Sequence, residues 1–396
     1  MARGSEIVSV DQVIDSCITK AVENKIIPGA VAAVVNRDGL VSIRSHGVRS
    51  EATQRPMTED TVFQIASMTK PITGAACMQA VERGLLELDQ PASEICPWLG
   101  EVQVLEGFNE SGPVLRSPNQ PVTLRNLLTH TSGFTYEVWN SDMAAWKDHT
   151  GNPITGSGKL ASLHQPLSFD PGTRWEYGIG IDWAGQLLEV ATGMPLAAWM
   201  QKEIFDPLEL VDTAYTCHPD MEERRAATHV LKEGNWTALE SSKPKRQPEF
   251  DSGGGGLFST ATDYAKFIQM LLRDGELAGQ QLLSPETISL MTSNNMNELR
   301  VSAVTSHNQK ISADFEFMTG VPKSWGLTFQ INETAVEQGR RKGSLSWAGL
   351  CNTHFWIDPT VGFGALLMTQ TLPFMIPQVA ELLEDFERAI YETVTP

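Results

Sequence analysis

A serine and a lysine three residues apart are the first candidates for chemistry in this chain. Ser67 and Lys70 lie in the stretch QIASMTKPITGAACM, and Pro71 follows the lysine directly. Residues three apart share a helix face, and proline is tolerated in the first helical turn, so a helix is predicted to start at Ser67. Backbone N–H groups at such an end favour an oxyanion. A buried lysine beside the serine can take its proton, which is the start of an acyl-transfer reaction.

The same residues also have a plainer interpretation. Ser67 can be an ordinary helix N-cap, and Lys70 a solvated side chain. A second Ser-x-x-Lys match, Ser242 to Lys245, lies in a charged segment broken by proline, and we interpret it as a chance match. The choice between the two interpretations therefore depends on partners elsewhere in the chain.

Composition limits the classes of function. The chain has 396 residues, of which 41% are apolar and 20% charged, so it can bury a large core in two or three structural units. The net charge of −18 argues against a nucleic-acid partner and against an anionic membrane surface. The histidines show no metal-ligand spacing, and we expect neither a metal nor a cofactor.

The cysteines and the first residues bear on location. Five cysteines are scattered without a CxxC pair, which favours reduced thiols over a disulfide framework. The stretch MARGSEIVSVDQVIDS has no apolar core of the kind a signal peptide needs. No apolar run is long enough for a membrane span. We expect a cytoplasmic protein that does not span a membrane, and the sequence leaves its oligomeric state, monomer or homo-oligomer, open.

The elements that must position Ser67 follow from hydrophobic periodicity. A helix is predicted over residues 10–27, and a hairpin over 30–48 turns at Asp38-Gly39. Four strand-like runs fall between 325 and 370, and a final helix covers about 376–394. The two ends of the chain are therefore predicted to form one α/β domain, 1–85 together with 255–396. Residues 86–254 form a mainly helical domain, with the active site between the two.

Nine segments then follow one another in the order of a known family. They include FQIASMTKPIT, TLRNLLTHTSGF, FDPGTRWEYG, GGGGLFSTATDYAKF and GSLSWAGLCNTHFWIDP. The sequence resembles the serine β-lactamase-like superfamily, which includes the penicillin-binding proteins, and in particular the family VIII carboxylesterases and their fungal acyltransferase relatives. The resemblance implies an α/β fold in which an antiparallel sheet is flanked by N- and C-terminal helices and joined to a mostly helical domain.

The resemblance also assigns roles. It makes Ser67 the nucleophile, Lys70 its lysine and Tyr177, in WEYG, the second-motif tyrosine. Either Lys70 or Tyr177 can be the general base, and this stays open. The third-motif strand reads Trp347-Ala348-Gly349 and is expected to bind substrate. The backbone N–H of Leu350 would form the oxyanion hole with that of Ser67.

Two departures from the lactamase pattern bear on the substrate. The second motif reads Tyr177-Gly178-Ile179, without the asparagine of Y-x-N, and Trp347 stands where lactamases carry the lysine of K-T-G. Both changes favour neutral esters, so we predict a serine carboxylesterase acting on small to medium acyl esters. The alternatives are an acyltransferase, a weak β-lactamase or D-amino-acid amidase of the same fold, and a non-catalytic penicillin-recognition scaffold.

Two further motifs are predicted to be structural. The run SGGGGLFST lacks the Gly-Lys-Ser/Thr of a phosphate loop. We expect a tight backbone approach there, followed by a helix capped by Ser259 or Thr260. His130 is tempting as the base of a triad, but the chain has no GxSxG elbow. We expect a loop histidine that satisfies backbone groups.

Overall fold

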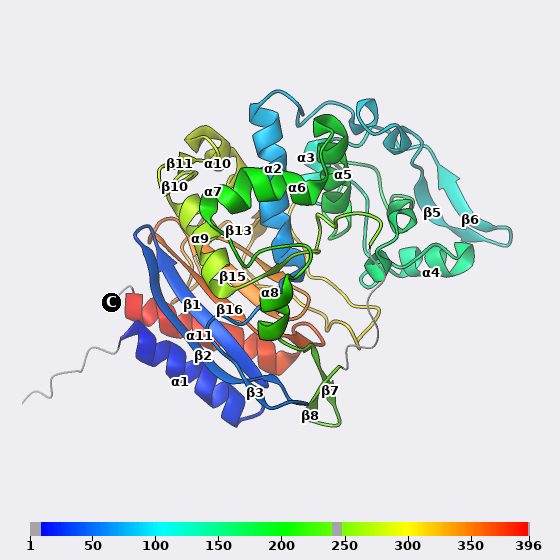
Figure 1. The fold of residues 1–396 in the computed structure, drawn as a ribbon. Helices are drawn as coiled ribbons and strands as arrows, with labels where there is room; N and C mark the ends of the chain where they lie inside the picture. Colours follow the sequence, from blue (N-terminus) through cyan, green and yellow to red (C-terminus); the bar gives the residue numbers. More distant parts are fainter. Residues whose placement is uncertain (1–8, 240–247, 395–396) are drawn as a thin grey trace, which may run out of the picture.

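The fold is known from a computed structural model that describes residues 9–239 and 248–394 (Figure 1). The second Ser-x-x-Lys match, Ser242 to Lys245, lies outside the described residues, as do the first eight residues of the stretch tested for a signal peptide.

An eight-stranded sheet forms the centre of the molecule, in the order β12-β13-β14-β15-β16-β1-β2-β3. Neighbouring strands in it run antiparallel. The strands are β1 (Gly29–Asn36), β2 (Gly39–Ser50), β3 (Arg55–Pro56), β12 (Lys323–Trp325), β13 (Gln330–Asn332), β14 (Leu345–Gly349), β15 (Thr353–Asp358) and β16 (Phe363–Met368). Both ends of the chain thus contribute to one antiparallel sheet, as predicted.

Helices cover both faces of this sheet. Successive side chains of a strand point to opposite faces, and β15 shows the consequence. Phe355 packs against Tyr264 of α9 (Ala261–Leu272), and Trp356 packs against Phe386 of α11 (Pro377–Val394). The first helix, α1 (Val10–Glu23), packs against α11 and β2 (Figure 1). The N- and C-terminal helices therefore flank the sheet together, and the predicted α/β fold is confirmed.

The remaining elements lie mostly above the sheet in Figure 1. The helices are α2 (Thr69–Glu82), α3 (Leu124–Leu128), α4 (Ser141–Thr150), α5 (Gly180–Thr192), α6 (Leu196–Met200), α7 (Asp206–Leu208), α8 (Pro219–Arg224) and α10 (Pro285–Met291). The short strands are β4 (Phe63–Gln64), β5 (Val104–Asn109), β6 (Gly112–Arg116), β7 (His229–Lys232), β8 (Asn235–Ala238), β9 (Phe258–Ser259), β10 (Glu276–Leu277), β11 (Gln280–Gln281) and β17 (Thr371–Leu372). The division into residues 1–85 with 255–396 and residues 86–254 stays a prediction.

Local signals set several of the element ends. α1 ends at Glu23, earlier than the predicted Ile27, and Lys25 takes a positive φ of 59° just beyond it. Gly193 ends α5 with a φ of 66°, which glycine adopts without steric cost. Thr260 caps α9 by accepting the Asp263 N–H, as predicted. In the parts of the chain that the structure describes, no helix has the length and apolar character to cross a bilayer.

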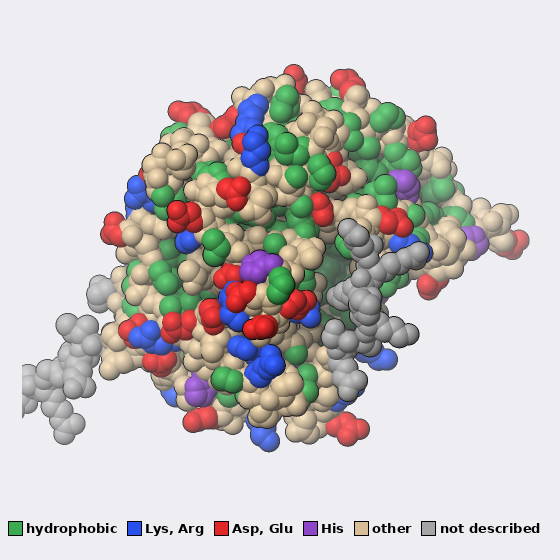
Figure 2. Space-filling model, in the orientation of Figure 1, with side chains coloured by type: hydrophobic (Ala, Val, Ile, Leu, Met, Phe, Trp, Pro, Cys, Tyr) green, Lys and Arg blue, Asp and Glu red, His purple; other side chains and the backbone are tan. Residues whose placement is uncertain are grey.

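Acidic and basic side chains are interspersed over the face shown in Figure 2. A nucleic-acid-binding surface collects its lysines and arginines into a continuous basic patch. On this face the acidic and basic side chains are mixed, and the absence of a nucleic-acid partner stays a prediction from composition.

Candidate active site

Ser67 lies on a short turn just before α2. Residues Ala66–Met68 form a 3-10 turn, and the α-helix begins at Thr69. The predicted helix start at Ser67 is therefore two residues too early. Pro71 falls in its first turn, where proline is tolerated. The N-cap position belongs to Met68, and no side chain caps the helix. The interpretation of Ser67 as an ordinary N-cap is therefore wrong.

Lys70 is fully buried and uses all three of its donors. Its Nζ donates to Ser67 Oγ at 3.0 Å, to the Tyr136 hydroxyl at 3.1 Å and to the Gly254 carbonyl at 2.6 Å. The side chain has 0% exposure, so the interpretation as a solvated lysine is also wrong. A lysine held this way is fixed against the serine hydroxyl in hydrogen-bond reach, as proton transfer requires.

The sequence analysis missed Tyr136. Its hydroxyl is the phenol that accepts from Lys70, and burial raises its pKa well above the usual value, with smaller contributions from Tyr177, Asp182 and Glu137. The phenol is therefore neutral at physiological pH. One signal was available: the chain has only five tyrosines, and Tyr136 lies two residues after the segment TLRNLLTHTSGF, which carries part of the family resemblance.

Tyr177 lies beside the same lysine but bonds elsewhere. Lys70 Nζ is 4.8 Å from the centre of the Tyr177 ring, and the phenol oxygen accepts a hydrogen bond from Trp347 Nε1 at 3.2 Å. Tyr136 and Tyr177 have ring centroids 5.2 Å apart. The structure thus brings together the three residues singled out from the sequence, Ser67, Lys70 and Tyr177, and adds a second phenol.

Glycine lets the two tyrosine segments meet. A Cβ on Gly178 would lie 1.9 Å from the Phe134 carbonyl oxygen, closer than any side chain permits. His130 also joins these segments, since its Nδ1 accepts from the Gly178 N–H at 3.3 Å. Burial lowers the pKa of His130 well below its usual value, and the charge of Lys70 adds to this. His130 is therefore a neutral loop histidine that satisfies a backbone group, as predicted.

The strand β14 brings its glycine against the serine turn. A Cβ on Gly349 would be 2.2 Å from the Ile65 carbonyl oxygen, and Thr353 Oγ1 donates to the same oxygen at 3.3 Å. The end of β14, and with it Leu350, therefore lies next to residues 65–67. Trp347 and Ala348 are 4% and 3% exposed, so this strand is mostly enclosed by protein.

The second-motif position that carries asparagine in lactamases is part of the core. Ile179 has no exposed surface and forms the N-cap position of α5. It offers no side-chain amide to a substrate. The preference for neutral esters stays a prediction.

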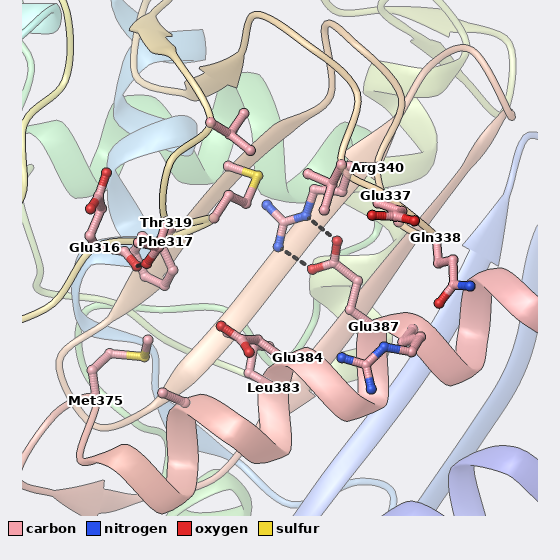
Figure 3. A pocket seen from close by; sticks show the side chains of 16 residues that line it. Glu316, Phe317, Thr319, Glu337, Gln338, Arg340, Met375, Leu383, Glu384 and Glu387 are labelled. Atoms are coloured by element: carbon pink, nitrogen blue, oxygen red, sulfur yellow. Dashed lines mark hydrogen bonds and ion pairs between the residues drawn. The ribbon is translucent and has the colours of Figure 1, made fainter.

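Two spaces lie near the third-motif strand: Trp347 lines one of them, and Phe317 lines both. A narrow pocket beside Trp347 is lined by aromatic side chains, among them Trp175, Phe315 and Phe317, and by polar ones that include Glu316 and Lys323. A separate cavity of about 370 Å³ lies between residues 316–321, residues 336–340 and α11. Figure 3 shows the buried Arg340–Glu387 ion pair in its wall. Within the described part of the chain, no three His, Cys, Asp or Glu side chains gather in a way that could hold a metal ion.

Comparison with known proteins identifies the family. The family model described as Beta-lactamase matches residues 14–385. The chain belongs to the beta-lactamase family. One curated relative, monacolin J acid methylbutanoyltransferase of Aspergillus terreus, is 34% identical, and the match covers 95% of this chain and 94% of that protein. Lovastatin esterase of Penicillium rubens is 32% identical over 95% of this chain and 97% of its own.

Solved structures of the beta-lactamase family agree with the fold. Unliganded simvastatin synthase from Aspergillus terreus aligns with a TM-score of 0.81 at 31% identity, covering 97% of this chain and 98% of that chain. EstCE1, described as a hydrolase with promiscuous acyltransferase activity, aligns with a TM-score of 0.75 at 20% identity over 96% and 98% of the two chains, which shows the fold alone. Family members similar to this chain thus include proteins named for acyl transfer and for ester hydrolysis.

Proposed function

We propose that the protein is a serine carboxylesterase that hydrolyses small to medium neutral acyl esters through an acyl-enzyme on Ser67. The observation that carries the proposal is the 3.0 Å hydrogen bond between Ser67 Oγ and the Nζ of a lysine with no exposed surface. A surface serine–lysine pair would be solvated, whereas the lysine of this pair is fully enclosed by protein and held against a half-buried serine.

The reaction starts from the form in which the Lys70 amine is unprotonated and accepts a hydrogen bond from the Ser67 hydroxyl; Ser67 Oγ attacks the ester carbonyl and its proton passes to the lone pair of Nζ. The backbone N–H groups of Ser67 and Leu350 are the proposed oxyanion hole, and the contact of Gly349 with Ile65 supports their proximity. The proton then moves to the departing alcohol oxygen, with Tyr177 as the second member of the shuttle. Water then attacks the carbonyl of the acyl-enzyme, its proton passes through the same groups to Ser67 Oγ as the acyl–oxygen bond breaks, and the acid is released.

The preference for neutral, apolar esters rests on the surroundings. Ile179 is buried in the core, and Trp347 occupies the third-motif position in place of a lysine. Trp347, Ala348 and Gly349 are proposed to line the substrate site, where the indole of Trp347 offers an apolar surface to an acyl or alcohol group. An anionic substrate would also meet the unfavourable field of a chain with a net charge of −18.

The test is a Ser67→Ala variant assayed with p-nitrophenyl butyrate. We expect hydrolysis to fall by about 10⁴-fold or more, because the nucleophile is lost. Ser289→Ala is the matched control, since Ser289 is exposed on α10. A fluorophosphonate should add one adduct to the Ser67 peptide of the wild-type protein. Unchanged hydrolysis by the Ser67→Ala variant would falsify the assignment, and absence of labelling would favour a non-catalytic scaffold.

A second candidate is acyl transfer to an alcohol through the same acyl-enzyme. The 34% identity to a protein named as a methylbutanoyltransferase, over nearly the full length of both chains, favours it. Product analysis with competing alcohols decides: an ester product that outweighs the free acid at millimolar alcohol would make transfer the main activity. Turnover of a chromogenic cephalosporin at the rate of esters would instead support a β-lactamase.

A further inference from the structure

The third partner of Lys70 is itself held by a buried carboxylate. Lys70 Nζ donates to the Gly254 carbonyl at 2.6 Å, the shortest of its three hydrogen bonds. The N–H of the same glycine donates to Asp182 Oδ1 at 3.0 Å, and Ser252 Oγ donates to that oxygen at 2.6 Å. Asp182 is 1% exposed. One residue of the glycine run therefore connects the lysine to an aspartate that the sequence analysis did not single out.

The glycine run has the close packing that this connection needs. A Cβ on Gly254 would be 2.4 Å from Asp182 Oδ2, and a Cβ on Gly253 would be 2.7 Å from the Ile181 carbonyl oxygen. Thr73 Oγ1, one turn after Lys70 on α2, donates to the Gly253 carbonyl at 2.7 Å. The run is thus fixed between α2 and α5, and its carbonyl groups cannot shift freely away from the lysine.

The charge of Asp182 is also placed to act on Lys70. Burial raises the pKa of Asp182, while Lys70 and the hydrogen bonds from Ser252 and Gly254 oppose that rise. Its Oδ2 is buried without a hydrogen-bond partner. A purely structural carboxylate normally has both oxygens paired, and a buried charge is costly unless another charge compensates it. Lys70 is the cation whose charge acts on this carboxylate.

Two other titratable groups near Lys70, His130 and Tyr136, are neutral at physiological pH. Burial lowers the pKa of His130 and raises that of Tyr136. Tyr177 faces Lys70 with its ring. Tyr215 donates to the Ser252 carbonyl next to Asp182, and burial raises its pKa well above the usual value. Asp182 is the carboxylate that interacts electrostatically with Lys70 and is also linked to it through the Gly254 peptide.

We propose that Asp182 is a positioning residue of the acyl-transfer site. It fixes the Gly254 peptide so that the carbonyl orients Lys70, and its charge stabilises the ammonium that forms when the Ser67 proton reaches Lys70 Nζ. The proposal rests on the proposed function, because it needs Lys70 to exchange that proton.

The decisive variant is Asp182→Asn, which keeps an oxygen acceptor and removes the charge. We expect kcat for p-nitrophenyl butyrate to fall about 10- to 100-fold with KM changed less than about threefold, since the contact acts on proton transfer rather than on binding. The acid limb of the pH profile of kcat/KM should move about one unit to lower pH, because the protonated site loses a neighbouring negative charge. Asp263→Asn is the matched control: Asp263 is a buried aspartate that bonds Asp212 N and Thr213 Oγ1. It should lose stability and keep the wild-type pH profile.

A glycine pair tests the geometry independently. Gly254→Ala places a Cβ within 2.4 Å of the Asp182 carboxylate, whereas the nearest atom to a Cβ on Gly255 is 3.7 Å away. We expect Gly254→Ala to lose most of its activity and Gly255→Ala to keep the wild-type pH profile. If Asp182→Asn does not fold, Ser252→Ala replaces it, with an expected loss of about fivefold in kcat from one weakened hydrogen bond to the carboxylate.

The outcomes separate the two proposals. Wild-type protein that takes no fluorophosphonate on Ser67 overturns the proposed function and this inference with it. Normal labelling and turnover by the wild type, combined with an Asp182→Asn variant of unchanged kcat and unchanged pH profile, overturns the positioning role alone. A variant that melts earlier and yet keeps the wild-type pH profile shows that Asp182 is only structural, which also overturns it.

Discussion

Trp347 donates a hydrogen bond from its indole Nε1 to the phenol oxygen of Tyr177, at 3.2 Å. Both side chains are nearly buried, with exposures of 4% and 3%. The hydrogen bond fixes the orientation of the Tyr177 phenol against the strand β14. The tryptophan of the third motif therefore bears on the chemistry of Tyr177, in addition to the substrate-binding role that we propose for it.

Replacing this donor should slow the chemical step. In Trp347→Phe the ring is kept and the N–H is lost, which costs about 1.5–3 kcal/mol if the phenol carries charge in the transition state and about 1 kcal/mol if it stays neutral. We expect kcat for p-nitrophenyl butyrate to fall about 10- to 100-fold with little change in the melting temperature. Trp236→Phe is the control, because its indole N–H donates to the Lys25 carbonyl and neither of these residues belongs to the proposed site. Wild-type kcat in Trp347→Phe would show that the hydrogen bond has no part in catalysis.

The two phenols around Lys70 can be separated by matched variants. Tyr177→Phe removes the proposed proton shuttle and should lower kcat by about 10²–10⁴-fold. Tyr136→Phe removes one acceptor of the lysine and should lower kcat about 10-fold, as expected for a single hydrogen bond to a charged group. Steady-state assays of both variants across pH 5 to 9 provide the measurement. The reverse order of losses would make Tyr136 the shuttle.

Local patterns explain why much of the fold could be predicted. The Asp38-Gly39 turn between two β-rich runs predicts the β1–β2 hairpin, whose strands pair as expected. Spacing along one helix likewise predicts the contact between Ser67 and Lys70. The long-range partners could not be predicted in this way. Gly254 is 184 residues from Lys70, and its carbonyl has no side-chain signature.

The missed tyrosine has a similar physical reason. Tyr136 and Phe134 lie on one loop, and Gly178 lies on another. Because Gly178 has no Cβ, the two loops can pack together at Phe134, and this brings Tyr136 to Lys70. Such a contact depends on the relative position of two loops that neither periodicity nor spacing determines. The family motif identified the tyrosine on one of these loops, Tyr177, and gave no reason to look at the other.

The third-motif glycine offers a test of how β14 approaches the serine turn. In Gly349→Ala the new Cβ would lie 2.2 Å from the Ile65 carbonyl oxygen, a distance that forces the strand and the turn apart. We expect esterase activity to fall by at least about 10²-fold, as when an oxyanion donor is displaced. Fluorophosphonate labelling of Ser67 should slow in parallel. Gly156→Ala is the matched control, since a Cβ there meets no atom within 4 Å. Equal activity of the two variants would contradict the proposed oxyanion hole at Leu350.

A histidine on the strand next to β14 should make the stability of the protein depend on pH. His354 is 2% exposed, and neither of its ring nitrogens has a hydrogen-bond partner. Burial, with a smaller contribution from Arg340, lowers the pKa of His354 to about 3. The unfolded chain titrates near 6.5 and therefore binds a proton at pH values where the folded chain does not. This contribution is fully present above about pH 6.5 and is lost as the pH falls from there toward about 3.

The measurement is urea unfolding of wild type and His354→Phe at pH 7.5, 5.5 and 4.5. An aromatic ring is kept in contact with Phe374, on which the imidazole stacks, so the variant should fold. We expect wild type to lose more free energy of unfolding than the variant on acidification, by at most about 2–3 kcal/mol between pH 7.5 and 4.5. The pKa values of His130 and His229 are also lowered, but both residues are present in both proteins, so the difference isolates His354. His218→Gln, at an exposed position on the surface, should follow wild type. Parallel stability curves for wild type and His354→Phe would mean that position 354 does not resist protonation in the folded protein.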